Sequence, residues 1–265
     1  MKITYSTAAD RTKAASETRK TGRRGVEMLA LACTSVISLL GLLLVFNAKL
    51  ASVADAGAQL AAHHIVDLSR VQSAAELVPA LTTIPDSGQR RVIADRVYEA
   101  ITTADSGGRR PALDSVAALG RVTVPVTDVL RDRRLAFLRD RVKPSTGAHD
   151  TTGETERTVR LLTPAQVADL KPAFVVRSTS DYRWAFGVAV AIFLAGFWAV
   201  HLLAQVRGRR SDALLLPIVQ LLCAMGLIAM ITLRDPLRDA MLFTRFAQGT
   251  ALGCVLMAAA SAIDY

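Results

Sequence analysis

The sequence predicts a mainly α-helical integral membrane protein, with four transmembrane helices and a mostly helical extracytoplasmic domain between the first and second helices. Two observations predict this class. Half of the 265 residues are apolar (51%), and they are concentrated in blocks, of which four approach or exceed the roughly 20 residues that span a bilayer. Short segments beside these blocks are rich in Lys and Arg, whereas one long polar region separates the first two blocks.

The four blocks carry very little charge. The first contains Glu27 at its edge, the second and third contain no Asp, Glu, Lys or Arg, and the fourth has Arg245 near one end, where a long side chain can reach the interface. A cleaved signal peptide is the alternative for the first block. Its 21 residues exceed the roughly 7 to 15 apolar residues of such peptides, so an uncleaved anchor is favoured. The predicted spans are residues 26–46, 184–206, 214–233 and 240–263.

The orientation follows from the basic residues. Residues 1–25 form an arm with seven Lys or Arg, and the 207–213 loop contains three Arg. Both segments are therefore expected in the cytoplasm, and residues 47–183 outside it. The same segments account for much of the net charge of +9. We expect membrane lipid, including anionic lipid, as a partner and expect no nucleic acid.

Residues 47–183 show mainly helical patterns. Ser73 and Glu76 form a capping-box pattern ahead of one helix, and Ile93 and Val97 mark the apolar face of another. Thr163 begins a second capping box, which has Pro at the first helical position. These signals predict several short helices in this region.

The rest of this region is less regular. Residues 128–142 are rich in Arg and predict a solvated helix, whereas residues 122–126 are too short and too interrupted by Pro to assign. Residues 174–177 predict a short strand or extended segment. Residues 143–158 contain five Thr, two Gly and no large apolar side chain, which predicts a flexible loop.

A charged hexapeptide, RDPLRD at residues 234–239, separates the third and fourth spans. Asp235 is placed to cap the fourth helix, with Pro236 at its first position. Arg234 and Asp239 are placed to pair near the interface, and Arg238 adds a second positive charge. Two interpretations remain open: a well-formed turn at the outer membrane surface, or a docking surface for a partner or for a further membrane domain of the same protein.

Several uncharged residues inside the spans suggest helix packing. Gly249 and Gly253 form a GxxxG pattern in the fourth span, which permits close packing. Packing within the chain is favoured over dimerisation. Gln220 and Gln248 are expected to form hydrogen bonds between helices, and His201 is expected to be an ordinary interfacial residue near the cytoplasmic end of the second span.

The residue types that carry most enzyme chemistry lack the required spacing. Cys33, Cys223 and Cys254 all fall within predicted spans, which indicates neither a disulfide nor a metal site. His63 and His64 are adjacent, so on a helix they point about 100° apart and cannot form a metal-binding pair. The sequence has no phosphate-binding Gly loop, zinc spacing or nucleophile elbow. We predict no catalytic residue, cofactor, metal or small-molecule substrate.

Several segments together resemble one known family. They are Arg24-Gly-Val ahead of the first span, HIVDLSRVQSAAELVPAL, RRVIADRVYEAI, LLTPAQVADLKPAFVVRS and LLLPIVQLLCAMGLIAMITLRDPLRDAMLFTRFAQGTALG. This arrangement covers most of residues 24–265 and is similar to the N-terminal extension of large FtsW/RodA/SpoVE (SEDS) family proteins. In those proteins an anchor, an extracytoplasmic helical region and three further spans precede a multi-span core. RDPLRD is the most specific element of the resemblance.

The resemblance implies a role in cell division and peptidoglycan synthesis, in the inner (cytoplasmic) membrane of a bacterium. The SEDS core polymerises lipid II, but none of these residues resembles that core, so no catalytic residue is carried over. We expect a non-catalytic module that localises or regulates wall synthesis. Its expected partners are cell-envelope or division proteins, or the missing SEDS core.

Two other functions remain as alternatives. A self-contained membrane sensor or adaptor would bind a ligand or protein with its extracytoplasmic domain, although the short cytoplasmic segments leave no room for an output domain. A DNA-binding role is suggested by residues 64–101, whose two predicted helices and intervening hairpin have the order of a helix-hairpin-helix unit. The usual Gly-x-Gly hairpin is missing, which favours a structural or protein-contact role.

Overall fold

The computed structural model describes residues 8–61, 65–103, 113–142, 158–207 and 214–260; within the first range, side chains are described for residues 25–54. The chain forms two compact units. The membrane unit comprises Met1–Lys49, Arg183–Leu233 and Leu242–Tyr265, and the globular unit comprises Leu50–Tyr182 and Arg234–Met241. The chain therefore crosses between the two units four times.

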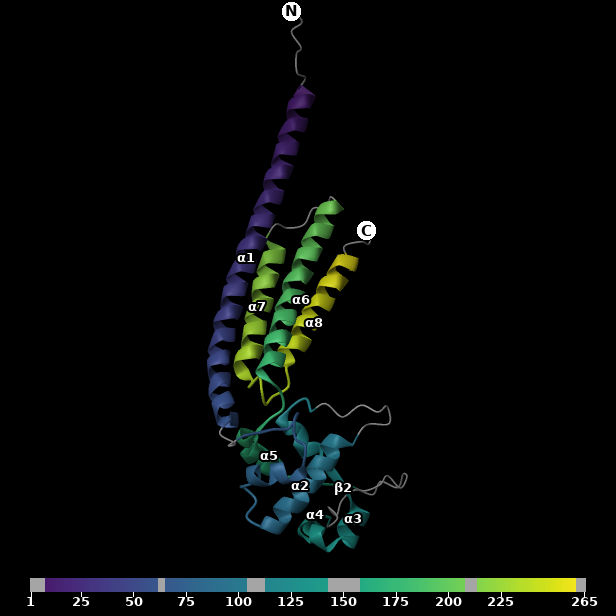
Figure 1. Ribbon diagram of the computed structural model, residues 1–265. Helices are drawn as coiled ribbons and strands as arrows, with labels where there is room; N and C mark the ends of the chain where they lie inside the picture. Colours follow the sequence, from purple (N-terminus) through teal and green to yellow (C-terminus); the bar gives the residue numbers. More distant parts are fainter. Residues whose placement is uncertain (1–7, 62–64, 104–112, 143–157, 208–213, 261–265) are drawn as a thin grey trace, which may run out of the picture. The chain divides into compact units, whose positions relative to one another are not determined.

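Four helices in the described residues are long and apolar enough to cross a membrane, which confirms the predicted mainly α-helical membrane class. They are α1 (Ala8–Ala61), α6 (Thr179–Val206), α7 (Leu215–Leu233) and α8 (Leu242–Ala260), and they run side by side in the membrane unit (Figure 1). Large apolar side chains such as those of Leu44, Val206 and Leu233 are exposed on them. Such exposure suits helices whose surroundings are lipid.

Aromatic side chains and glycines set the packing inside the membrane unit. Phe46 on α1 stacks on Phe186 of α6, with ring centroids 4.2 Å apart. On α7, a Cβ atom added to Gly226 would lie 2.9 Å from the ring of Phe246 on α8. The missing side chain at this glycine therefore lets α8 approach α7 closely.

The globular unit is built from short helices and two small sheets. The 3-10 helices are η1 (Ala74–Ala80), η2 (Val116–Arg121), η3 (Arg133–Leu138) and η4 (Lys171–Ala173). The α-helices are α2 (Ser87–Thr102), α3 (Val126–Arg131), α4 (Arg139–Val142) and α5 (Pro164–Leu170). Strand β1 (Val66–Asp67) pairs in parallel with β4 (Phe174–Val175), and β2 (Thr123–Pro125) pairs antiparallel with β3 (Thr158–Arg160).

One apolar core holds these pieces together. It contains side chains from η1, α2, η2, η3, α5 and β4, among them the buried Leu77, Ile93, Leu119, Leu138 and Phe174. Because every helix confined to this unit except the 16-residue α2 has seven residues or fewer, the shared core rather than helix propensity stabilises them. The predicted apolar face of α2 is confirmed, since Ile93, Ala94 and Val97 are buried.

One sequence-based prediction in this unit is wrong, and one unassigned segment forms a strand. Residues 128–142 do not form one solvated helix, because Asp132 has an extended backbone and its side chain accepts a hydrogen bond from the N–H of Arg134, which starts η3. Leu135 and Leu138 are then buried in the core. Residues 122–126, which the sequence left unassigned, supply β2, and Pro125 occupies the end of that strand.

The two capping boxes have different outcomes. The Thr163 box is confirmed: its hydroxyl accepts from the N–H of Gln166 at 3.2 Å, and the Gln166 side chain accepts from the N–H of Thr163 at 2.9 Å. The Ser73 hydroxyl instead donates to the Glu76 carboxylate, and the helix that follows is the 3-10 helix η1. The predicted loop at 143–158, apart from Thr158, which begins β3, lies outside the described residues. So do the pair of His residues at 63 and 64 and most of the 207–213 loop.

Candidate functional site

The RDPLRD hexapeptide belongs to the globular unit and forms a turn that is hydrogen-bonded into it. The prediction that Asp235 caps the fourth helix, with Pro236 at its first position, is wrong, because α8 begins at Leu242. The Asp235 side chain instead accepts from the N–H of Leu237 at 3.0 Å, and its carbonyl accepts from the N–H of Asp239 at 2.8 Å. Asp235 therefore organises the 234–239 turn itself.

Arg238 connects this turn to the segment that contains η4 and β4. Its guanidinium donates to the carbonyl of Phe174 at 3.3 Å and to the carbonyl of Pro172 at 3.0 Å. A third bond, at 2.8 Å, reaches the Asp235 carboxylate within the turn. The planar, five-donor guanidinium of Arg can serve three acceptors in this way, whereas a Lys ammonium presents a single charged centre.

Asp239 makes a shorter ionic contact than Asp235 does. One carboxylate oxygen lies 2.6 Å from Nζ of Lys171 and the other accepts from the N–H of Asp235 at 3.1 Å. Burial alone would raise the pKa of this carboxyl, but the bonds from Lys171 and Asp235 outweigh burial and hold the pKa below its usual value. Lys171 is thus a partner of Asp239 that the sequence did not indicate, and the Arg234 charge also favours the ionised carboxylate.

Arg177 binds the last residue of the turn. Its guanidinium donates to the carbonyl of Asp239 at 2.6 Å and also to the carbonyl of Asp114. Burial lowers the pKa of Arg177 from its usual value, although the nearby carboxylates of Asp114, Asp181 and Asp239 oppose that shift. Arg177 therefore joins three segments that are far apart in the sequence.

Backbone bonds and one buried side chain complete the attachment. The N–H of Val116 donates to the carbonyl of Arg238 at 2.8 Å, and the N–H of Val176 donates to the carbonyl of Leu237 at 3.0 Å. Leu237 is buried in a small cluster with Val53, Ile65 and Val175. Because α7 ends at Leu233 and α8 begins at Leu242, the connection between these two helices is an integral part of the globular unit.

A second polar cluster lies inside the membrane unit. His201 of α6 is 1% exposed, and its Nδ1 lies 3.4 Å from a carboxylate oxygen of Glu27 on α1. Its Nε2 lies 2.7 Å from the side-chain nitrogen of Gln205. When the Gln205 amide donates to Nε2, the proton of a neutral imidazole is on Nδ1 and faces Glu27. His201 is therefore a buried residue with a polar partner at each ring nitrogen.

Neighbouring polar side chains extend this cluster to α7. The indole N–H of Trp198 donates to the Ser35 hydroxyl at 3.2 Å, and the Gln220 amide donates to the same hydroxyl at 2.9 Å. The Gln220 carbonyl accepts from the hydroxyl of Thr34 at 2.9 Å. The expectation that Gln220 bonds between helices is confirmed, and α1, α6 and α7 share one polar contact region.

The GxxxG residues do not contribute to packing among the described residues. A Cβ atom added to Gly249 or Gly253 would have no atom within 4 Å. The close approach involves Gly226 and Gly196 instead: a Cβ on Gly196 of α6 would lie 3.4 Å from Sγ of Cys254 on α8. The preference for packing of Gly249 and Gly253 within the chain is therefore not supported in the described part of the structure.

Sequence reasoning missed three of the contributing residues, Glu27, Lys171 and Arg177. Glu27 was the one acidic residue in the first apolar block, and His201 was the one His in the second. Ionisable groups in such blocks require a partner, so this pair carried a usable signal. Lys171 and Arg177 carried none, because their partners lie more than 60 positions away in the sequence.

Among the described residues, no group of three or more His, Cys, Asp or Glu is placed to hold a metal ion. The charged groups of the turn are engaged by donors and acceptors of the same chain. Comparison of the chain with protein-family models, curated proteins and solved structures finds no match.

Proposed function

We propose that this chain is the non-catalytic membrane module of a SEDS-like protein, and that it localises or regulates peptidoglycan synthesis in the inner membrane of a bacterium. In this proposal the N-terminus is cytoplasmic, the globular unit is extracytoplasmic, and the partners are division or elongation proteins or a SEDS core. The resemblance of the sequence, with RDPLRD as its most specific element, is the source of the wall-synthesis assignment.

The observation that supports a regulatory role is the attachment of the 234–239 turn to the globular unit. Arg238 and Asp239 connect the turn to Pro172, Phe174 and Lys171. A partner that shifts the segment around β4 would therefore act directly on the linker between α7 and α8. Such an effect requires that the partner bind one arrangement of this contact better than another.

The test is co-purification from the native host. The full chain would be tagged and cross-linked in cells, and the recovered proteins would be identified by mass spectrometry. Wall-synthesis polymerases or division proteins should be recovered with the wild type, less with Arg238→Ala, and unchanged with Asp169→Asn, an exposed acidic residue on α5 of the same unit. Recovery of no wall-synthesis protein at all would refute the proposal.

The proposed orientation has its own test. Reporter fusions at residue 150 should be active outside the cytoplasm, and fusions at residue 209 should be active inside it. A cytoplasmic signal at residue 150 would overturn the orientation without bearing on the partners.

A self-contained sensor or adaptor is the second candidate, and the polar cluster of the membrane unit favours it. Hydrogen bonds are directional, so a shift of α6 would break its contacts with α1. A cysteine pair at Ser35 and Trp198 would report such a shift through its cross-linking rate. A co-purified signalling protein, with no wall-synthesis protein, would select this candidate over the first.

A further inference from the structure

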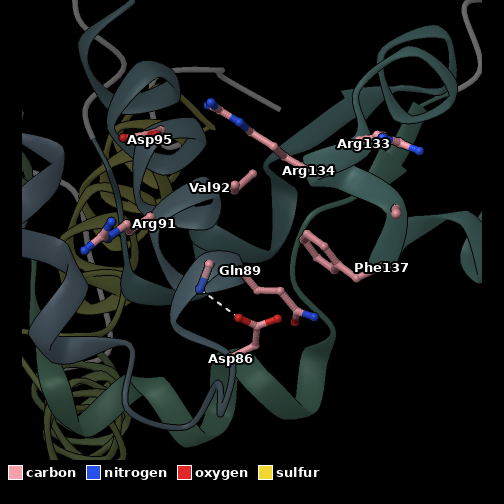
Figure 2. Close-up of a pocket in the computed structure, with 10 residues that line it drawn as sticks. Asp86, Gln89, Arg91, Val92, Asp95, Arg133, Arg134 and Phe137 are labelled. Atoms are coloured by element: carbon pink, nitrogen blue, oxygen red, sulfur yellow. Dashed lines mark hydrogen bonds between the residues drawn. The ribbon is translucent and has the colours of Figure 1, made fainter.

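The globular unit contains a cavity between α2 and η3 that no part of the proposed function uses. Its volume is about 540 Å³, within the range of roughly 300 to 1,000 Å³ typical of ligand sites. Its walls come from the first half of α2 and from most of η3 (Figure 2). The residues that line it include Gln89, Val92, Arg134 and Phe137.

The two walls of the cavity are held in place by local caps. The Asp86 carboxylate accepts from the N–H of Gly88 at 2.7 Å and fixes the start of α2. The Asp132 carboxylate accepts from the N–H of Arg134 at 2.8 Å and fixes the start of η3. Because both elements also pack into the apolar core, the cavity is a formed feature of the unit and not a gap between loose segments.

The centre of the cavity is apolar. Val92 from α2 and Phe137 from η3 are partly buried and pack against the core, and Figure 2 shows their side chains directed toward the space between the two elements. Gln89 lies beside Phe137 and offers an amide that both donates and accepts. An aliphatic side chain of a ligand would be buried here.

Three arginines also line the cavity. Arg91, Arg133 and Arg134 have no ion pair or side-chain hydrogen bond with any residue in the described part of the chain, whereas nearby Arg96 is paired with Glu99 and Asp128. Figure 2 shows the Arg134 side chain extending from η3 past Val92 toward α2, whereas the side chains of Arg91 and Arg133 point away from the space between the two elements. Unpaired guanidiniums beside an apolar site are suited to carboxylates, which they bind through charge-assisted and often bidentate hydrogen bonds.

Two aspartates define the kind of anion. Asp86 and Asp95 also line the cavity, so its formal charge is +1, from three Arg and two Asp. Two carboxylates would repel the closely spaced charges of a nucleic acid, whereas a peptide presents isolated carboxylates together with amide and aliphatic groups. We propose that this cavity binds a short acidic peptide segment of a partner, with an aliphatic side chain between Val92 and Phe137 and a carboxylate on Arg134.

The proposal goes beyond the proposed function and is tested without any wall-synthesis protein. The full chain would be placed in nanodiscs of zwitterionic lipid and titrated against a fluorescein-labelled hexapeptide of alternating glutamate and leucine, with anisotropy as the readout. A peptide with glutamine in place of glutamate is the control ligand. The acidic peptide should bind at least about tenfold more tightly, because only it offers carboxylates to the guanidiniums.

The variants locate the binding. Arg134→Ala should weaken binding of the acidic peptide about tenfold, and Arg91→Ala with Arg133→Ala should weaken it less, because these two side chains point away from the space between α2 and η3. Arg121→Ala is the matched control, since this exposed arginine on η2 does not line the cavity. Hydrogen exchange at the Val116 and Val176 amides would establish that each variant is folded.

Three results would overturn the proposal. They are equal binding of the acidic and glutamine peptides, an unchanged affinity in Arg134→Ala, and an equal loss in Arg121→Ala, which would indicate attraction by overall charge alone. Binding of the chain to vesicles containing anionic lipid, blocked by Arg134→Ala and without binding of the peptide, would assign the cavity to a lipid headgroup and would equally refute a peptide ligand.

Discussion

Replacing Asp239 with Asn is expected to loosen the 234–239 turn from the globular unit by about 1 to 2 kcal/mol. The carboxylate contacts Nζ of Lys171 at 2.6 Å and the N–H of Asp235 at 3.1 Å. Exposed ion pairs contribute about 0.2 to 1 kcal/mol, whereas breaking a buried pair costs about 3 to 5 kcal/mol. The Asp239 side chain is 10% exposed and that of Lys171 is 39% exposed, so the cost should fall between these limits.

Two backbone amides report on this contact. Val116 and Val176 donate to the carbonyls of Arg238 and Leu237, so each amide is released when the turn separates from the rest of the unit. Hydrogen exchange measured by mass spectrometry on the full chain should therefore become about 5 to 30 times faster at both sites in Asp239→Asn. Exchange in the centre of α2 should remain unchanged, because the core does not depend on the turn.

The matched control is Asp169→Asn, which removes one exposed carboxylate from α5 in the same unit. It should leave exchange at Val116 and Val176 unchanged. Lys171→Met, made both in the wild type and in Asp239→Asn, completes a double-mutant cycle. We expect a coupling free energy of about 1 kcal/mol between the two side chains. If Asp239→Asn and Asp169→Asn gave the same exchange rates, the contact would not stabilise the turn and the reasoning would be wrong.

Three further predictions concern the 234–239 turn and the membrane unit. The pKa of Asp239 is lowered in the folded state, so the carboxylate stabilises the turn fully above the unfolded-state pKa of about 3.9. This stabilisation is lost as the pH falls through the lower folded-state pKa. Hydrogen exchange at Val116 and Val176 measured against pH should show the loss in the wild type and not in Asp239→Asn. Gly226→Ala should lower the free energy of unfolding by about 1 to 3 kcal/mol because the added methyl group would meet Phe246, whereas Gly249→Ala should leave it unchanged. Thermal melting of the two variants in nanodiscs would test this. An unchanged melting temperature in Gly226→Ala would contradict the close packing of α7 and α8. Gln220→Leu should lower the free energy of unfolding by about 0.6 to 1.7 kcal/mol, the range for hydrogen bonds between membrane helices, when measured by the same thermal melting. A variant more stable than the wild type would show that the Gln220 hydrogen bonds are dispensable.

The spans were predictable because a bilayer imposes one simple requirement on the sequence. Any helix that crosses it needs about 20 apolar residues, so length and composition identify α7 to within one residue and the end of α6, although α6 begins five residues before the predicted span. The Thr163 capping box was predictable for a similar reason, since both of its bonds join residues three positions apart. Local rules predict local structure well.

The contacts of the 234–239 turn were not predictable, because their partners are distant in sequence. Asp followed by Pro after an apolar block is a common helix start, and nothing nearby indicated that the carbonyls of Pro172 and Phe174 would receive Arg238. The prediction of one helix over residues 128–142 failed for another reason. A single extended residue, Asp132, divides what composition alone suggested was one helix.

The contacts of the 234–239 turn with the rest of the globular unit explain why it contains four charged residues. A connection between two membrane helices needs only a few polar residues, and water would satisfy their backbone groups. Here the turn contacts the rest of the globular unit, so its carbonyls bond to Val116, Val176 and Arg177, and its own Arg238 and Asp239 bond back to that unit. Each charge has a partner, and removing one leaves the other partly buried and unpaired. The turn is therefore expected to stay attached or to separate as a whole, which is the two-state behaviour that a regulatory contact between the globular unit and the α7–α8 linker requires.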